Sequence, residues 1–283
     1  MKILHLLLPL LLLVMLATVA SGAEMEPMRL RLDHEQREQG QFFTVTVTCA
    51  PEEPVLWFMA RPYRMFRQLD SSWRALLPVE NLTLPGSYLL LLRSGASEQK
   101  RSIIVAANSR PIQHIALDFS KAELKATEIE KSRVKAALHT ESQEKLFTGS
   151  FLRPASGRTS SLFGMKRSYN GAAIESYHKG VDIAAPQGTP VHSSAKGRVI
   201  LTGRVDGGFQ VHGNTVIIDH GQALISIYMH LSAISVHEGQ LVEAGEVIGN
   251  VGHTGISTAP HLHWGTYLYG TSVDPELFEG CEF

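Results

Sequence analysis

Apolar and polar residues alternate in short runs near the start of the chain. Residues 43–49 alternate apolar side chains with threonine, residues 55–60 are largely apolar, and residues 86–93 follow the turn signal of Pro85. Alternation with a period of two residues is typical of strands that bury one face. The pattern predicts a small β-sandwich-like module over residues 25–107.

The C-terminal half has the same short apolar runs, now separated by glycine. Twenty of the 24 glycines follow residue 148, and no apolar stripe of helical period is long enough to form an amphipathic helix. Many short runs divided by turn residues are typical of antiparallel β-structure. The pattern therefore predicts an antiparallel β-sheet domain over residues 149–283, with strands in residues 197–201, 214–219, 224–230, 246–252 and 261–267.

A charged stretch separates these two regions. Residues 118–145 contain no glycine, many acidic and basic side chains, and sparse apolar residues without clear periodicity. Such a stretch indicates a solvated helix or a pair of short helices. The predicted fold class is mainly β, with a charged helical linker over residues 108–148.

The first residues predict export from the cytoplasm. Lys2 precedes an uncharged, largely apolar run over residues 6–20, and small residues follow at positions 21–23. This is the pattern of a secretory signal, which we assign to residues 1–22, and no cysteine follows to suggest a lipoprotein. The alternative is a single membrane anchor, which needs about 20 apolar residues and a flanking stop signal.

Charge and cysteine content narrow the possibilities further. The 26 basic side chains nearly balance the 27 acidic ones, so no overall field favours nucleic acid or an anionic membrane. In an oxidising compartment, Cys49 and Cys281 can form a disulfide. The alternative is a buried free thiol at Cys49, on the apolar face of its alternating run.

Histidine is the residue type with candidate chemistry. Nine of the thirteen histidines lie from His178 onward; His178 and Asp182 are four residues apart, and His261 and His263 are two apart. On an extended strand, even spacings place side chains on one face, so both pairs can point into one site. Three such ligands with a fourth position open are typical of catalytic zinc. Chance proximity of ordinary histidines and a structural zinc, which usually takes four ligands, stay open as alternatives.

A series of sequence blocks over residues 151–276 resembles the LytM/lysostaphin-type zinc peptidases, which cut peptidoglycan peptides. The blocks are RTSSLFG (158–164), HKGVDIAAPQGTPV (178–191), GRV (197–199), GNTVIIDHG (213–221), YMHLS (228–232), VHEG (236–239), TGISTAPHLHWG (254–265) and VDP (273–275). Their common order is much more specific than any one block alone.

The resemblance implies a role for each residue of the site. His178, Asp182 and His263 would bind one zinc ion, and His230 and His261 would be the catalytic histidines. Substrate grooves in such enzymes are walled just upstream of the ligands, which makes Arg158 and Asn170 candidate substrate contacts, with turn chemistry as the alternative. The family pattern needs no ligand at the other C-terminal histidines, which we interpret as structural or exposed: His192, His212, His220, His237 and His253.

The implied function is hydrolysis of peptidoglycan cross-links through a metal-activated water, in cell-wall remodelling in the periplasm. The alternative is a non-catalytic peptidoglycan-binding or amidase-activating protein, since some family members have degenerate sites. All five expected site residues are present here, which favours the enzyme. The third candidate, a metal-buffering protein, would not explain the ordered blocks.

The expected partner is peptidoglycan, with no nucleic acid, no stable membrane anchor and a possible periplasmic regulator. Residues 73–78 (WRALLP) and 84–88 (LPGSY) resemble the small β-domain that precedes the peptidase in some exported Gram-negative members. That module favours a D-alanyl–diaminopimelate cross-link as the substrate. A Gly-Gly bond, which suits the lysostaphin branch, is the alternative.

Overall fold

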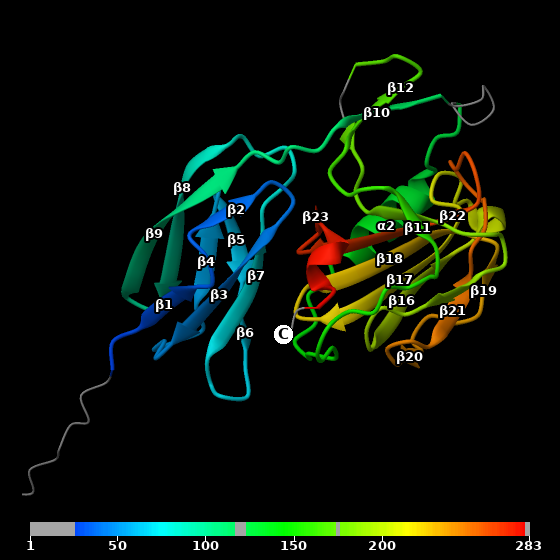
Figure 1. Cartoon of the computed structure of the whole chain (residues 1–283). Helices are drawn as coiled ribbons and strands as arrows, with labels where there is room; N and C mark the ends of the chain where they lie inside the picture. The colour runs from blue at the N-terminus through cyan, green and yellow to red at the C-terminus, as the bar shows by residue number, and fades with distance from the viewer. Residues whose placement is uncertain (1–25, 117–122, 174–175, 281–283) are drawn as a thin grey trace, which may run out of the picture.

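The computed structural model describes residues 26–116, 123–173 and 176–280 (Figure 1). The predicted signal segment at residues 1–22 and Cys281 lie outside the described residues. Figure 1 shows two β-rich parts side by side, the N-terminal strands in blue to green and the C-terminal strands in green to red. The predicted mainly β fold class is confirmed. Within the described residues, no helix combines the length and apolar character needed to cross a membrane.

The N-terminal strands form two sheets around one apolar core. Alternate residues of β3 (Phe42–Thr48), including Val45 and Val47, are fully buried, as the alternation predicts. The strands expected in this part are confirmed, and they are antiparallel except for the β2–β9 pair. The sheet orders are β1 (Arg29–Leu32), β3, β7 (Trp73–Pro78), β6 (Phe66–Arg67); and β2 (Gln36–Glu38), β9 (Ser97–Ala106), β8 (Gly86–Ser94), β4 (Val55–Phe58), β5 (Arg61–Arg64).

The C-terminal part is built on an eight-stranded antiparallel sheet. Its central strands are buried on both faces, which explains why their sequences are apolar runs and not strict alternations. The order is β11 (Arg158–Ser161), β14 (Val181–Ala184), β22 (His261–Leu268), β18 (Leu224–Leu231), β17 (Asn214–Gly221), β16 (Gly197–Gly203) and β20 (Leu241–Val242), with β23 (Thr271–Val273) paired to β22.

Two three-stranded sheets flank this large sheet. One contains β15 (Pro190–His192), β21 (Val247–Asn250) and β19 (Ala233–Ile234). In the other, β10 (Ile112–Ile115) pairs in parallel with β12 (Lys166–Tyr169), which also pairs with β13 (Ser176–Tyr177). Short 3-10 turns, η1 (Val205–Gly207) and η2 (Pro275–Phe278), complete the elements.

The charged stretch contains the expected helix, α2 (Glu128–Leu138), but it is solvated on one side only. Its side chains at Glu130, Val134 and Ala137 are buried, and the last two belong to an apolar cluster with Phe209 of the C-terminal part. Spacings of four and three residues place all three on one helix face. An acidic residue at one of these positions concealed the buried face in the sequence.

Cys49 does not have the environment expected of a buried thiol. The residue follows the last position of β3, has a left-handed backbone (φ 55°) and is exposed. The apolar face of β3 ends before it, so the buried-thiol alternative is wrong. The proposed bridge stays a prediction, since its partner lies outside the described residues.

Candidate metal centre and active site

The candidate site lies at adjoining ends of β14, β22 and β18. Asp182 on β14 is the direct cross-strand partner of His263 on β22, and Met229 on β18 faces His263 from the other side. His261 precedes His263 by two residues, so the two side chains share one face of β22. Antiparallel pairing thus brings residues that are about 80 positions apart in the chain into one cluster.

Three side chains present donor atoms to a common point. His178 Nε2, His263 Nδ1 and Asp182 Oδ1 lie 2.9 Å from one another in each pairing. Within the described part of the chain, they form the one group of three or more such side chains with metal-binding spacing. Two imidazole nitrogens and one carboxylate oxygen are donor types that zinc prefers, so the residues fit a zinc site.

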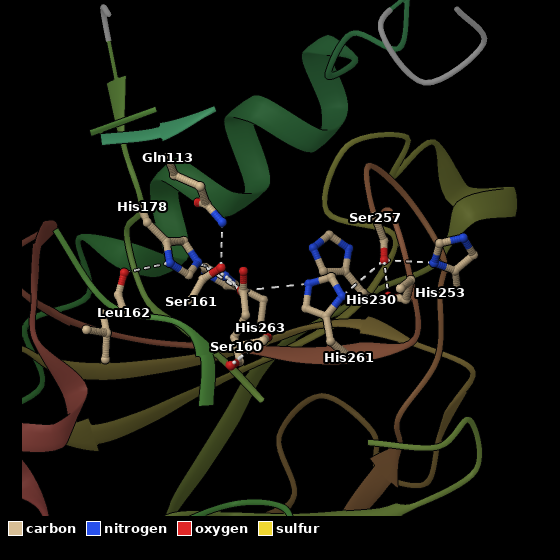
Figure 2. Close-up of polar contacts among 12 residues, drawn as sticks. Gln113, Ser160, Ser161, Leu162, His178, His230, His253, Ser257, His261 and His263 are labelled. Carbon is tan, nitrogen blue, oxygen red and sulfur yellow. Dashed lines mark hydrogen bonds and ion pairs between the residues drawn. The ribbon is translucent and has the colours of Figure 1, made fainter. Parts of the chain in front are cut away.

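His178 reaches this cluster by a route that spacing did not predict. It lies in the connection between β13 and β14, and not on one strand face with Asp182. Gly180 lets the connection pass close to β22, because a Cβ there would lie 2.4 Å from the Trp264 carbonyl oxygen. His178 Nδ1 donates to the Leu162 carbonyl oxygen at 2.9 Å, which directs Nε2 into the cluster (Figure 2).

Burial keeps the two imidazoles neutral, as metal binding requires. It lowers the pKa of His178 and lowers the pKa of His263 to about 4. Burial alone would raise the pKa of Asp182, but the adjacent His178 and His263 outweigh burial and hold that pKa well below its usual range. The charged carboxylate and neutral rings are the protonation states that bind zinc.

Two further histidines lie beside the donors. The rings of His230 and His261 lie next to each other (Figure 2), with their centroids 4.9 Å apart. His261 Nε2 is 3.7 Å from Asp182 Oδ1. His261 Nδ1 donates to the Ala259 carbonyl oxygen, and His230 Nδ1 donates to the Thr254 carbonyl oxygen, both at 2.8 Å. These bonds assign the Nδ1–H tautomer to both rings and leave each Nε2 as an acceptor.

A break in the regular pairing of β18 determines where the His230 side chain points. The pairing of β17 with β18 shifts register between Asn214 and Val216, opposite Leu231 and Tyr228, and His230 has a φ of 63°. A β-bulge redirects a side chain, and a left-handed backbone is uncommon for residues other than glycine. The local backbone is therefore shaped to place this ring among the site residues.

The sequence-predicted substrate residues border the same region. Arg158 lines a cavity of about 330 Å³ together with Asp182, His261 and His263. Asn170 lines an adjoining pocket with His230 and His263, and has a left-handed backbone (φ 50°). The structure thus brings both residues near the candidate site.

Arg167 is a site residue that the sequence reasoning missed. Its Nη2 donates to Asp182 Oδ2 at 3.1 Å, and its Nε donates to Gln113 Oε1 at 3.1 Å. Gln113 comes from β10, on the parallel edge of the neighbouring small sheet, and also donates to Ser161 Oγ (Figure 2). Spacing gave no signal for these contacts because they depend on the β10–β12 pairing.

Of the other C-terminal histidines, four have contacts that fit structural roles. His220 is buried with Nδ1 bonded to the Lys196 carbonyl oxygen, and His192 Nδ1 bonds the Gly245 carbonyl oxygen. His253 Nδ1 lies 2.8 Å from Ser257 Oγ, and His212 Nδ1 lies 2.6 Å from Glu130 Oε1 of helix α2.

Comparison with known proteins identifies the fold. The model of peptidase family M23 matches residues 176–275. The crystal structure of a peptidase M23 from Pseudomonas aeruginosa superposes with a TM-score of 0.60 at 30% identity, covering 82% of this chain and 89% of that chain. The chain therefore belongs to peptidase family M23. Membership confirms the resemblance inferred from the sequence, and the group of His178, Asp182 and His263 fits the zinc cofactor of this family.

The curated M23 relatives are similar over part of their length. Identity is 50% over 98 residues with the DD-carboxypeptidase/endopeptidase Mpg of Neisseria meningitidis, covering 35% of this chain and 22% of the relative. It is 39% over 117 residues with the peptidoglycan DD-endopeptidase ShyA of Vibrio cholerae, covering 41% of this chain and 26% of that relative. The chain thus spans about a quarter of the length of these relatives.

Proposed function

We propose that this M23 protein is a zinc-dependent endopeptidase that hydrolyses peptide cross-links of peptidoglycan in cell-wall remodelling. The observation that carries the proposal is the cluster of His178, Asp182 and His263, with the acceptor nitrogens of His230 and His261 beside it. A binding protein needs no such combination, whereas hydrolysis needs both a metal site and proton acceptors.

In this proposal, His178, Asp182 and His263 hold the metal. Zinc supplies a Lewis acid that polarises a peptide carbonyl and acidifies a water molecule. Arg167 binds the second oxygen of the Asp182 carboxylate and so fixes the direction of the first. Two neutral imidazoles and one carboxylate leave a net positive charge at the site.

His230 and His261 act on the proton. Each ring keeps its Nδ1–H on a backbone carbonyl, so each Nε2 accepts a hydrogen bond from the attacking water and orients it. Once one ring has taken the proton, its Nε2–H donates to the developing oxyanion or to the leaving amine. Arg158 and Asn170, at the edges of the two pockets, contact the peptide on either side of the cleaved bond.

We further propose a periplasmic location, reached through a signal segment at residues 1–22, and a D-alanyl–diaminopimelate cross-link as the substrate. The relatives named DD-endopeptidase support this bond over a Gly-Gly bond. In this assignment residues 149–283 form the peptidase unit, residues 108–148 the linker and residues 25–107 the N-terminal module.

Digestion of isolated sacculi tests the function. The purified protein is expected to convert cross-linked dimeric muropeptides to monomers, as measured by mass spectrometry, to lose this activity with a strong chelator, and to regain it with added zinc. The His263→Ala variant, treated with the same zinc, is the control. An unchanged ratio of dimers to monomers with zinc-loaded wild-type protein would contradict the proposal.

A further inference from the structure

A buried carboxylate on α2 has no part in the chemistry described so far. Glu130 is 0% exposed and receives four N–H groups from the connection that precedes β17. Oε1 accepts from His212 N at 2.7 Å, from His212 Nδ1 at 2.6 Å and from Val211 N at 3.0 Å, while Oε2 accepts from Gln210 N at 3.0 Å.

Glu130 is ionised in this setting. Burial alone would raise its pKa, but the hydrogen bonds from His212 and its neighbours outweigh burial and hold the pKa below its usual value. A buried carboxylate saturated by N–H donors fixes the position of the backbone that supplies them. Thr127 strengthens the same attachment, because its Oγ1 caps α2 and donates to the Gly208 carbonyl oxygen.

The connection held by Glu130 supports His230 directly. The His212 carbonyl oxygen accepts the backbone N–H of His230 at 3.1 Å, and the Val211 carbonyl oxygen accepts that of Ile256 at 2.9 Å. Residue Thr254, in the segment with Ile256, supplies the carbonyl oxygen that receives His230 Nδ1–H.

The two segments also touch closely through glycine. A Cβ at Gly213 would lie 2.5 Å from Thr254 Oγ1, and one at Gly255 would lie 2.4 Å from the Val211 carbonyl oxygen. Neither position has room for a side chain, so residues 210–213 and 254–256 are in direct backbone contact. Displacing the first segment is therefore expected to disturb both hydrogen-bond partners of His230.

From this chain of contacts we infer that Glu130 is a positioning residue for His230. Glu130 fixes residues 210–212, and these hold the uncommon left-handed backbone of His230 and, through the 254–256 segment, its ring. Val211 also lines the pocket beside His230. By binding the Val211 N–H, the Glu130 carboxylate therefore also helps to position one wall of that pocket. The catalytic consequence of this inference rests on the proposed peptidase function.

The test compares Glu130→Ala with two other variants. Glu130→Ala is expected to lower kcat on a purified cross-linked muropeptide roughly 10- to 100-fold, because small misplacements of a catalytic group have effects of that size. KM and the zinc content are expected to stay close to wild type, since no metal donor contacts residues 210–212 in the hydrogen bonds described above. Glu130→Gln keeps an oxygen for His212 and Val211 but turns an amide toward Gln210 N–H, so part of the kcat is expected to return.

Val134→Ala is the matched control. It removes packing from the same helix face, against the cluster that contains Phe209, and leaves the carboxylate in place. A similar loss of thermal stability with kcat close to wild type would separate positioning from simple helix attachment. A fall in the kcat of Val134→Ala equal to that of Glu130→Ala would overturn the inference. Loss of zinc from Glu130→Ala would also overturn it.

Amide hydrogen exchange gives a readout that does not depend on activity. In Glu130→Ala, the amides of residues 210–212 and of His230 are expected to exchange at least about tenfold faster than in wild type, with β14 and β22 unchanged. Unchanged exchange at His230 would overturn the inference. Absence of hydrolysis by the zinc-loaded wild type would instead remove the proposed function, while the exchange data still decide whether Glu130 holds His230.

Discussion

The two histidines of β22 share a strand face, but only one reaches the other metal donors. His263 Nδ1 lies 2.9 Å from both His178 Nε2 and Asp182 Oδ1, whereas His261 Nε2 lies 3.7 Å from that oxygen. Even spacing predicted the shared face, but which ring meets His178 and Asp182 depends on the β14–β22 register, which one sequence does not reveal.

Separate losses of zinc and of turnover are therefore expected for the two histidines. His263→Ala removes a donor, so the dialysed protein should lose zinc and activity together. His261→Ala should retain zinc while kcat falls about 10²- to 10⁴-fold, the usual contribution of a proton acceptor. Metal analysis of dialysed protein and muropeptide release provide the two measurements. Equal zinc loss in both variants would contradict the assignment.

His220 makes the free energy of unfolding depend on pH. The residue is remote in sequence from His178, Asp182 and His263. The ring is fully buried, and burial lowers its pKa to about 4. Because the pKa of the unfolded chain is about 6.5, the unfolded state takes up the proton first as pH falls. The contribution of neutral His220 to the free energy of unfolding is thus fully present above about pH 6.5 and is lost as pH falls toward 4.

Urea unfolding measures this contribution. Between about pH 7.5 and 4.5, the free energy of unfolding of wild type is expected to fall by about 2–3 kcal/mol more than that of His220→Gln, since one pKa unit corresponds to about 1.4 kcal/mol. Loss of zinc at acid pH affects both proteins and cancels in the comparison. Identical pH dependence in the two proteins would show that His220 does not titrate as described.

At the scale of elements, the sequence predicted where strands form but not which strands pair with one another. The alternation in β3 and the apolar runs of β17, β18 and β22 reflect burial of strand faces, which is a local property of the sequence. Pairing is non-local, so nothing in the sequence indicated that β10 lies parallel to β12, beside the site.

Helix α2 shows how one polar residue conceals a buried face. Glu130 and Val134 lie on the same side as Ala137, but a carboxylate at the first position makes the face look solvated. Its burial is possible only because residues 210–212, some 80 positions away, supply four N–H donors. The family blocks pointed to the three side chains that the structure brings together, His178, Asp182 and His263, but not to the residues that hold them in place.

At the scale of the whole molecule, β22 connects the site to the N-terminal sheets. The strand begins at His261, and Tyr269 follows its other end, about 25 Å away at roughly 3.3 Å per residue. Tyr269 Oη donates to the Arg64 carbonyl oxygen at 2.7 Å, its ring packs edge-on against Tyr63 at 5.2 Å, and its carbonyl oxygen accepts from Arg61. Burial raises the pKa of Tyr269 above its usual value, so the hydroxyl stays a donor.

Tyr269→Ala is therefore expected to weaken the contact between the N-terminal and C-terminal parts and to leave the metal site intact. Removing a buried aromatic ring typically costs about 3–5 kcal/mol in the free energy of unfolding, which urea titration would measure. Leu89→Ala, at an exposed position of β8, is the control and should change stability by less than about 0.5 kcal/mol. Zinc content under native conditions should be unchanged in both variants, because the donors lie at the opposite end of β22. Loss of zinc from Tyr269→Ala while the protein remains folded would contradict this expectation. It would show that the contact between the two parts and the metal site are coupled through β22.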